Sequence, residues 1–539
     1  MKTGIPARPK VGIIPVFADH QRRGAHHRGV LQPQIGPLIA ALLPEGVDID
    51  IVNDTWEDPD WRRHYDLLFI SCLHSDFDRA RQIAHYWRRR GAKTVLGGNL
   101  ASTFPQLVTP YFDAVVIGDP ETTVPRIWQD FTRGALQPLY VAGPYDPAQT
   151  PTPRYDLVLG KQPMPIGVET SRGCPFSCEF CALTALGTRY QVRPPASVIR
   201  DIEAARACQH RFAFWPRRNI AGFYDNNIGG GKRELRALCD ALASVHLYWG
   251  VCIGFNMLRD EDMLARLARA GCRCLFVGFE SFNSATLDDL GKRQNSITEV
   301  RAAIERCRRQ GILVMAGLML SPSTDDIAYI DSIPERLRDC GLHVPTYVAF
   351  ETPFPGTPHF ARLAAEAEPA FLPNALLRDF NGYTLVMRPR HATTEEFIAA
   401  YKRVVGRVFA PSARLRKLAL DAAGFLRRGH LIPLVYDAVE LATERPDLPP
   451  ARNYLAGLDI APPEYDGRVP LAAVDFDSSA HRHAVLEPTK VTDADGRVLP
   501  IWLDARTAYP CRRSTTLTQV PSRPSSMAYP SGWTAAVTG

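Results

Sequence analysis

Three cysteines gather on one short stretch of the chain, at Cys174, Cys178 and Cys181. Their C-x3-C-x2-C spacing lets one tight loop wrap a metal cluster, and Gly173 and Pro175 supply the turn. Thiolates are the ligands that iron–sulfur centres select, and three of them leave one iron of a four-iron four-sulfur cubane open. An open coordination position is typical of a catalytic metal site. The spacing therefore predicts a catalytic iron–sulfur cluster.

A structural zinc site and a chance grouping of cysteines stay open as alternatives. A structural zinc site would need a fourth Cys or His in a comparable short pair. Cys208 and His210 follow only after a predicted helix. Chance clustering of buried cysteines would explain neither the spacing nor the place of the motif directly after a predicted strand. The cluster remains the hypothesis that accounts for both observations.

The cysteine loop follows the first strand of a repeating pattern of strands and helices. The six expected strands are Ile166–Glu169, Ala221–Asp225, Trp249–Ile253, Leu275–Glu280, Leu313–Leu320 and Tyr347–Glu351. Helical patterns separate them, and the helix over Ser296–Arg309 opens with a Ser296–Glu299 capping box. Repeated βα units predict a partial (βα)6 TIM-like barrel, in which active-site groups come from the C-terminal ends of the strands.

An earlier strand–helix series precedes the cysteines and forms a second expected unit. Its strands are expected at Val11–Phe17, Val47–Val52, Leu67–Ser71, Thr94–Leu96 and Phe112–Ile117. Alternation of this kind predicts a doubly wound, Rossmann-like parallel sheet. The expected division of the chain is a first domain over 1–142, a Pro-rich linker over 143–160, the barrel over 161–390, a helical extension over 391–446 and an irregular, partly disordered tail over 447–539.

Composition limits the classes of protein to consider. Hydrophobic residues make up 45% and charged residues 22% of the 539, which is the balance of a globular protein. The net charge of +6 is mild, and many arginines neighbour acidic residues, so no nucleic-acid groove is expected. The apolar run Ile312–Leu320 is too short to span a bilayer. No signal peptide is recognised at the N-terminus, and we expect a cytoplasmic protein.

The cysteine motif, with the aromatic Phe180 directly before Cys181, resembles the signature of the radical S-adenosylmethionine (radical SAM) superfamily. The resemblance covers roughly residues 160–390, because the downstream strands correspond as well. It implies that Cys174, Cys178 and Cys181 hold a 4Fe-4S cluster. It also implies that the open iron binds S-adenosylmethionine and that one electron cleaves this cofactor to a 5′-deoxyadenosyl radical.

The same resemblance implies which residues contact S-adenosylmethionine. Asp225 would lie near the methionine amino group, Glu280 would contact the ribose, and Gly317 would let the adenine approach the backbone; Phe180 belongs to the cluster motif. Each position also has a plainer structural role open to it. The Asp225–Asn227 stretch could form an Asx turn, Glu280 could pair with a barrel arginine, and Gly317 could serve packing.

The first domain resembles the cobalamin-binding domain that precedes the barrel in one large subgroup of the superfamily. Supporting residues are Ser71, at the end of the third expected strand, and Gly97 and Gly98, directly after the fourth; ligands bind at these carboxyl ends in parallel sheets. The resemblance implies that they lie along the nucleotide tail of cobalamin. The sequence departs from the D-x-H-x-x-G pattern, because Asp19 and His20 are adjacent and Gly24 follows; His26 and His27 lie nearby.

The domain order favours cobalamin-dependent methylation of an unactivated carbon in a small-molecule or lipid substrate. Electrons would come from a donor such as flavodoxin or ferredoxin. A cobalamin-free radical enzyme that cyclises, rearranges or oxidises its substrate is an alternative, because the fold does not separate these reactions. A protein of another class, a non-catalytic corrinoid or redox sensor, would produce no 5′-deoxyadenosine.

Overall fold

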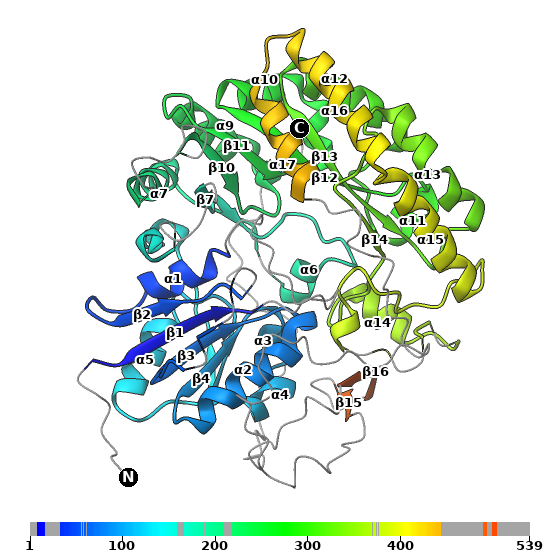
Figure 1. The fold of residues 1–539 in the computed structure, drawn as a ribbon. Coiled ribbons are helices and arrows are strands. Elements are labelled where there is room, and N and C mark those ends of the chain that lie inside the picture. Colours follow the sequence, from blue (N-terminus) through cyan, green and yellow to red (C-terminus); the bar gives the residue numbers. More distant parts are fainter. Residues whose placement is uncertain are drawn as a thin grey trace, which may run out of the picture.

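A computed structural model describes residues 8–16, 33–54, 57, 59–60, 62–158, 166–187, 189–208, 218–368, 370–372, 375, 377–443, 489–492 and 498–503. Two α/β units lie one above the other in Figure 1, with the N-terminal sheet below the second sheet. Each sheet has six strands, and every strand pairing within these two sheets is parallel.

The N-terminal sheet has the strand order β2-β1-β3-β4-β5-β6. Its strands are β1 (Lys10–Pro15), β2 (Asp48–Ile51), β3 (Leu67–Ser71), β4 (Lys93–Gly97), β5 (Ala114–Ile117) and β6 (Leu139–Val141). The chain adds β2 on one side of β1 and β3 on the other, so the order reverses between β1 and β3. A ligand crevice opens at such a reversal, beyond the carboxyl ends of the strands.

Helices cover both faces of this sheet. They are α1 (Ile35–Ala41), α2 (Phe77–Arg89), α3 (Asn99–Thr103), α4 (Pro105–Val108) and α5 (Val124–Thr132). The longest, α2, begins after the short 3-10 helix His74–Asp76 and ends before Gly91, whose φ of +93° suits a glycine at a helix C-terminus. The expected doubly wound sheet is confirmed, with β6 as a strand that the sequence analysis did not anticipate.

The second sheet has the order β14-β13-β12-β11-β10-β7. Its strands are β7 (Ile166–Val168), β10 (Ile220–Phe223), β11 (Tyr248–Cys252), β12 (Cys272–Glu280), β13 (Leu313–Leu320) and β14 (Tyr347–Phe350). No pairing joins β7 to β14 among the described residues, so this sheet is an open, partial barrel. All six strands expected from the sequence are present within a few residues of their predicted bounds.

Helices on the outside of the barrel bury one apolar face each, as α10 does with Met263, Leu264 and Leu267. These helices are α7 (Pro195–Cys208), α9 (Lys232–Leu242), α10 (Glu261–Arg269), α11 (Ser284–Asp289), α12 (Val300–Arg309) and α13 (Ile327–Cys340). Two further helices, α6 (Ala182–Leu186) and α14 (Pro358–Ala364), lie toward the N-terminal unit instead: α6 contacts α3, and Phe360 of α14 joins the buried cluster that includes Phe77. One expectation was wrong: Ser296 makes no capping hydrogen bond, because a 3-10 helix, Ile297–Glu299, precedes α12.

The chain continues into three helices, α15 (Thr394–Val408), α16 (Pro411–Leu426) and α17 (Ile432–Thr443). A capping box does start α15, where Thr393 and Glu396 bond each other's backbone amides. In the tail, β15 (Thr489–Thr492) and β16 (Val498–Leu503) form an antiparallel pair that the sequence analysis did not expect. Among the residues described, no helix is long and apolar enough to cross a membrane.

Candidate cluster and cofactor site

The cysteine loop is held in shape by glycine and by a small strand pair. Ser171 and Arg172 (β8) pair with Gln191 and Val192 (β9). Gly173 has a φ of +83°, and a Cβ there would lie 2.3 Å from the carbonyl oxygen of Arg189. Only glycine fits such a position. The chain therefore turns directly before Cys174, and the loop leaves the carboxyl end of β7.

Within the loop, the three cysteines form one compact turn. The amide of Cys181 donates to the carbonyl of Cys178 at 3.1 Å, and α6 begins directly afterwards. Side-chain amides approach two of the sulfurs: Nδ2 of Asn227 lies 3.6 Å from Sγ of Cys174, and Nε2 of Gln294 lies 3.6 Å from Sγ of Cys178. N–H donors aimed at sulfur are typical of thiolates that ligate a cluster. The donor set fits an iron–sulfur cluster.

Asp225 lies at the end of β10 and is 1% exposed. Its carboxylate accepts from the amide and hydroxyl of Thr170, at 3.0 and 2.7 Å, and from the hydroxyl of Ser171. Burial raises the pKa of Asp225 to about 6, although these hydrogen bonds oppose the shift. The carboxylate thus anchors the segment that leads to Cys174. The predicted contact with the methionine amino group stays a prediction.

Glu280 ends β12 in a strained conformation, with a φ of +65°. Its carboxylate pairs with Nζ of Lys292 at 2.5 Å, and Lys292 lies 5.4 Å from the centre of the Phe180 ring. Burial lowers the pKa of Lys292, but the negative charges of Glu280, Cys178 and Cys181 have the larger combined effect, so the pKa of Lys292 is raised. The partner of Glu280 in the protein is thus a lysine, where the sequence analysis considered an arginine. Backbone strain at a buried, charged position is typical of functional sites.

Gly317 lies in the middle of β13, paired with Gly278 on β12. A Cβ at Gly317 would lie 2.5 Å from the ring of Tyr347, so this side of the strand is filled by an aromatic side chain. Tyr347 in turn stacks on Phe276, with 5.9 Å between ring centres. These contacts favour a packing role for Gly317. A contact with adenine stays a prediction.

The residues predicted for a cobalamin tail meet at one edge of the N-terminal sheet. Ser71 and Gly97 are register partners at the carboxyl ends of β3 and β4. The nearest atom to a Cβ at Gly97 would be 3.9 Å away, which leaves room there. Gly98 differs, because its φ is +104° and a Cβ would lie 2.5 Å from the carbonyl oxygen of Cys72. Asp19, His20, His26 and His27 lie outside the described residues.

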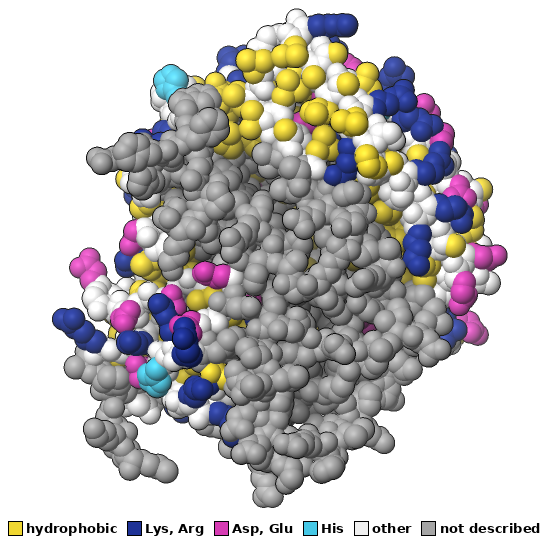
Figure 2. Space-filling view, viewed as in Figure 1, with side chains coloured by type: hydrophobic (Ala, Val, Ile, Leu, Met, Phe, Trp, Pro, Cys, Tyr) yellow, Lys and Arg dark blue, Asp and Glu magenta, His cyan; other side chains and the backbone are white. Residues whose placement is uncertain are grey.

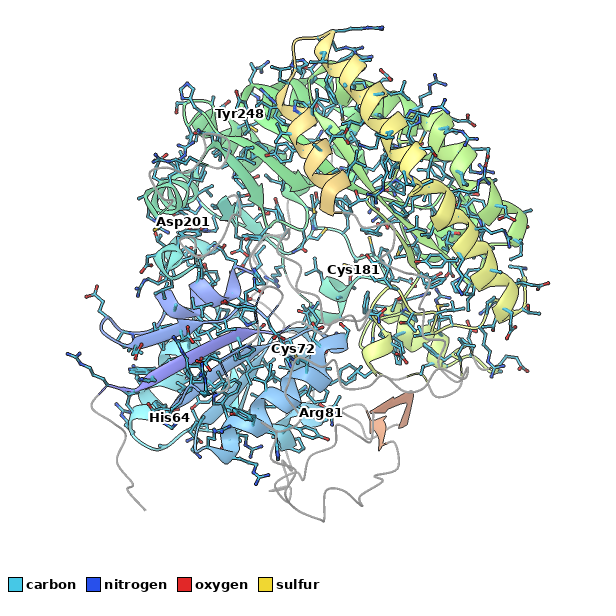
Figure 3. All side chains as sticks on the ribbon, in the orientation of Figure 1. His64, Cys72, Arg81, Cys181, Asp201 and Tyr248 are labelled. Carbon is cyan, nitrogen blue, oxygen red and sulfur yellow. The ribbon has the colours of Figure 1, made fainter. Side chains whose placement is uncertain are left out.

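The edge of the N-terminal sheet and the cysteine loop are neighbours. Helix α3 begins directly after Gly98, α6 begins directly after Cys181, and the two helices contact each other. Figure 3 shows Cys72 on the side of the N-terminal sheet that faces Cys181. A Cβ at Gly356, in the loop after β14, would also lie 3.5 Å from Thr103 of α3.

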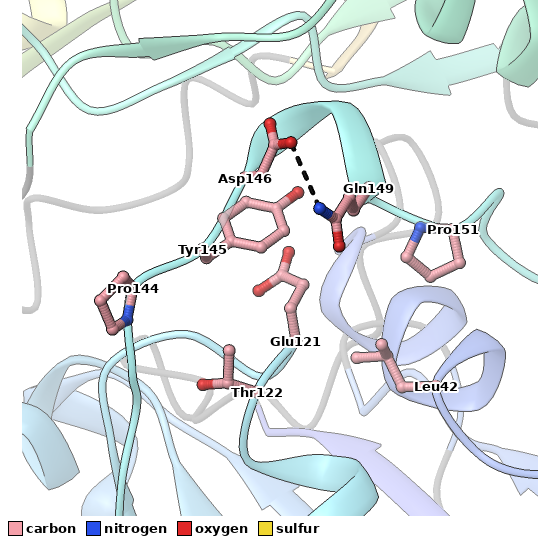
Figure 4. Close-up of a pocket in the computed structure, with 8 residues that line it drawn as sticks. All are labelled: Leu42, Glu121, Thr122, Pro144, Tyr145, Asp146, Gln149 and Pro151. Carbon is pink, nitrogen blue, oxygen red and sulfur yellow. Dashed lines mark hydrogen bonds between the residues drawn. The ribbon is translucent and has the colours of Figure 1, made fainter.

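An ion pair joins the two units beside this contact. Arg172 of the cysteine loop pairs with Glu121, at 2.9 Å, and with Glu169, at 2.8 Å. Glu121 also lines an open pocket of about 460 Å³ with Leu42, Tyr145 and Asp146 (Figure 4). Burial raises the pKa of Glu121, and the charge of Arg172 opposes this shift.

A second polar group lies against the cysteine loop, at Glu351, His359 and Asp289, whose ligand-type atoms lie within 4.8 Å of one another. Arg362 approaches Nδ1 of His359 at 2.8 Å and the carboxylate of Asp289 at 3.0 Å. A guanidinium only donates, so Nδ1 accepts, and the proton of a neutral His359 is on Nε2, facing Glu351. That nitrogen then has no free lone pair for a metal. We interpret the group as a support of the loop, since the amide of His359 donates to the carbonyl of Glu179.

Comparison with known proteins identifies the second unit. Residues 168–331 match the sequence profile of the Radical SAM superfamily. The chain carries a radical SAM domain. Such a domain holds a 4Fe-4S cluster and S-adenosylmethionine, which confirms the prediction made from the cysteine spacing and identifies the chain as an enzyme.

Relatives and solved structures extend the match to both units. The bacteriochlorophyllide d C-8(2)-methyltransferase of Chlorobaculum tepidum is 27% identical over 335 residues, which span 59% of this chain and 73% of the relative. The hopanoid C-2 methylase of Rhodopseudomonas palustris is 22% identical over 410 residues, which span 72% of this chain and 73% of the relative. The radical S-adenosylmethionine methyltransferase TsrM from Kitasatospora setae, solved with cobalamin and a [4Fe-4S] cluster, superposes with a TM-score of 0.54 at 17% identity, over 80% of this chain and 99% of that chain. The radical SAM domain thus follows a sheet arranged as in that protein.

Several residues of the site were missed by sequence reasoning. Asn227 was considered only as a turn residue, and its Oδ1 does accept from the amides of Gly229 and Gly254. Gln294 and Lys292 come from the loop after α11, where no strand end or motif drew attention to them. Arg172 stands two residues before Cys174, and this short distance along the chain is the only sequence signal that could have indicated Arg172 as a site residue.

Proposed function

We propose that this radical SAM enzyme methylates an unactivated carbon with the help of cobalamin. A bound cluster would supply the electron for cleavage of S-adenosylmethionine, and a bound corrinoid would supply the methyl group. The observation that carries this proposal is the contact between α3 and α6. Because these helices start at Gly98 and Cys181, the two proposed cofactor edges would lie next to each other.

Different residues of the chain would bind the cluster and the corrinoid. Cys174, Cys178 and Cys181 would bind the cluster, while Asn227 and Gln294 would orient two of the sulfurs. Asp225 would fix the loop through Thr170 and Ser171. Small side chains let a ligand approach the backbone, so Ser71 and Gly97 would admit the nucleotide tail of the corrinoid.

The names of two relatives support a proposal for the substrate class. One is named for bacteriochlorophyllide d and another for a hopanoid. We therefore propose a largely apolar small-molecule or lipid substrate. We also propose a cytoplasmic location and an electron donor such as flavodoxin or ferredoxin.

The test uses the full chain, reconstituted anaerobically with iron, sulfide and cobalamin. Wild type should show the absorption of both a cluster and a bound corrinoid, and it should release 5′-deoxyadenosine from S-adenosylmethionine on reduction. Gly97→Leu fills the room beside Ser71 and should abolish corrinoid absorption while 5′-deoxyadenosine formation persists.

Gly406→Leu is the matched control, because Gly406 lies on α15 and a Cβ there would meet nothing within 4 Å. This variant should bind corrinoid like wild type. If wild type shows no bound corrinoid with excess cobalamin, the methylation proposal fails and a cobalamin-free radical reaction replaces it. If 5′-deoxyadenosine is also absent while the cluster is intact, the sensor hypothesis replaces both.

A further inference from the structure

The C-terminal helices α16 and α17 form a hairpin, and the inner face of this hairpin contacts the barrel through hydrogen bonds and ion pairs. The hydroxyl of Tyr436 donates to the carbonyls of Ala221 and Tyr248, at 3.2 and 3.1 Å. Lys417 pairs with Asp421 and Asp437 in a buried group that Arg308 of the barrel joins at 3.1 Å. Because charged groups buried in pairs fix geometry, the outer face of the hairpin is held in a defined orientation.

That outer face exposes large apolar side chains instead of polar ones. The exposed fractions are 68% for Leu415, 44% for Leu420, 52% for Leu426, 62% for Leu431 and 36% for Val435. On α16, Leu415, Ala419 and Leu426 lie on one exposed stripe, and Leu420 lies further around the exposed half of the same helix. Figure 2 shows hydrophobic side chains gathered over the region where Figure 1 places α16 and α17. Contiguous exposed apolar surface of this kind marks an interaction site.

Within the hairpin itself, the exposed charges have one sign. Between Pro411 and Ala438 the acidic residues are Asp421 and Asp437, and both are buried. The exposed charged residues of this stretch are Arg416, Arg427 and Arg428. An apolar surface with arginines beside it is complementary to a partner that has an apolar interior and negatively charged groups at its surface.

We propose that the outer face of the α16–α17 hairpin docks on the surface of a membrane that contains anionic lipids. The leucines would enter the boundary between head groups and acyl chains, and the three arginines would contact lipid phosphates. A second copy of the chain fits less well, because a two-fold pairing of this face would bring its own arginines together. The proposal goes beyond methylation and holds whatever the reaction is.

The experiment is flotation of the reconstituted full-length protein with lipid vesicles. Wild type should float with vesicles of phosphatidylcholine and phosphatidylglycerol, and less with phosphatidylcholine alone. Leu415→Ser/Leu426→Ser/Leu431→Ser should lower the partition coefficient at least about tenfold on both, because each leucine loses its apolar contact. Arg416→Gln/Arg427→Gln/Arg428→Gln should remove the preference for phosphatidylglycerol, and added salt should do the same in wild type.

The matched control compares single changes. Val141→Ser removes an apolar side chain that is 46% exposed on β6, far along the chain from the hairpin, and should leave flotation unchanged, whereas Leu431→Ser should reduce it. Cluster content checks the folding of each variant. The proposal is wrong if wild type does not float, if it floats equally with both vesicles, or if light scattering shows a dimer that the leucine variant loses while no variant changes flotation.

Discussion

Arg172 of the cysteine loop and Glu121 of the N-terminal unit form a two-pronged ion pair, with N–O distances of 2.9 and 3.2 Å. The side chain of Glu121 is 4% exposed and that of Arg172 is 19% exposed, so solvent screens the pair little. Since Arg172 stands two residues before Cys174, this contact ties the position of the cluster loop to the N-terminal sheet.

We predict that Glu121→Gln weakens the attachment between the units. Arg172 keeps Glu169 and Asp119 as partners, so the loss should be moderate, about 1–3 kcal/mol, and the melting temperature in scanning calorimetry should fall by several degrees. The control is Asp156→Asn, which removes an exposed ion pair with Arg154 and should change the melting temperature little. Equal shifts in the two variants would contradict the proposed coupling.

The two glycines after β4 should respond differently to substitution. Gly98→Ala should destabilise the N-terminal unit, because its positive φ and the 2.5 Å approach to the Cys72 carbonyl leave no place for a Cβ. Gly97→Ala should leave the melting temperature nearly unchanged, since its Cβ would have room. Calorimetry of both variants compares their melting temperatures. A larger decrease in Gly97→Ala than in Gly98→Ala would contradict the assigned turn.

His74, which begins the 3-10 helix after β3, should make stability depend on pH. Burial lowers its pKa to about 4, while an unfolded histidine titrates near 6.5. Between these values the unfolded chain binds a proton that the folded chain excludes, so stability falls as the pH falls from about 6.5 toward 4. In His74→Phe the melting temperature of the apoprotein should fall less steeply over this range. Parallel profiles for wild type and variant would show that His74 does not contribute.

Lys292 should influence the cluster through its charge. Lys292→Met removes the cation beside Cys178 and Cys181 and leaves Glu280 buried without its partner. Loss of this cation makes the surroundings of the thiolates more negative, so the reduction potential of the cluster should become more negative. Spectroelectrochemical titration measures it. Lys232→Met, at an exposed ion pair with Asp260, is the control and should leave the potential unchanged.

The fold was predictable because local patterns carry it. The predicted strands Leu67–Ser71 and Leu313–Leu320 have the observed bounds, since continuous apolar runs mark buried parallel strands. The three-residue strand Leu139–Val141 was missed because it is short and leads into a Pro- and Gly-rich segment. The expected capping role of Ser296 failed because a 3-10 turn replaced the first turn of the helix.

The candidate site was predictable where its residues are close in sequence. The three cysteines share one loop, so their spacing alone indicated the cluster. The contacts of Glu280 with Lys292 and of Arg172 with Glu121 depend on the packing of separate elements, which no local pattern records. The room at Gly97 and its absence at Gly98 likewise appear only once neighbouring strands are placed.

The most direct test of the central claim is the anaerobic assay of S-adenosylmethionine cleavage in a Cys174→Ala/Cys178→Ala/Cys181→Ala variant. Wild type, reconstituted and reduced, should show the electron paramagnetic resonance signal of one 4Fe-4S cluster and form 5′-deoxyadenosine. The triple variant should show neither, whereas Cys208→Ala, which changes a half-buried cysteine outside the motif, should show both. A triple variant that retains the cluster signal and forms 5′-deoxyadenosine would contradict the account.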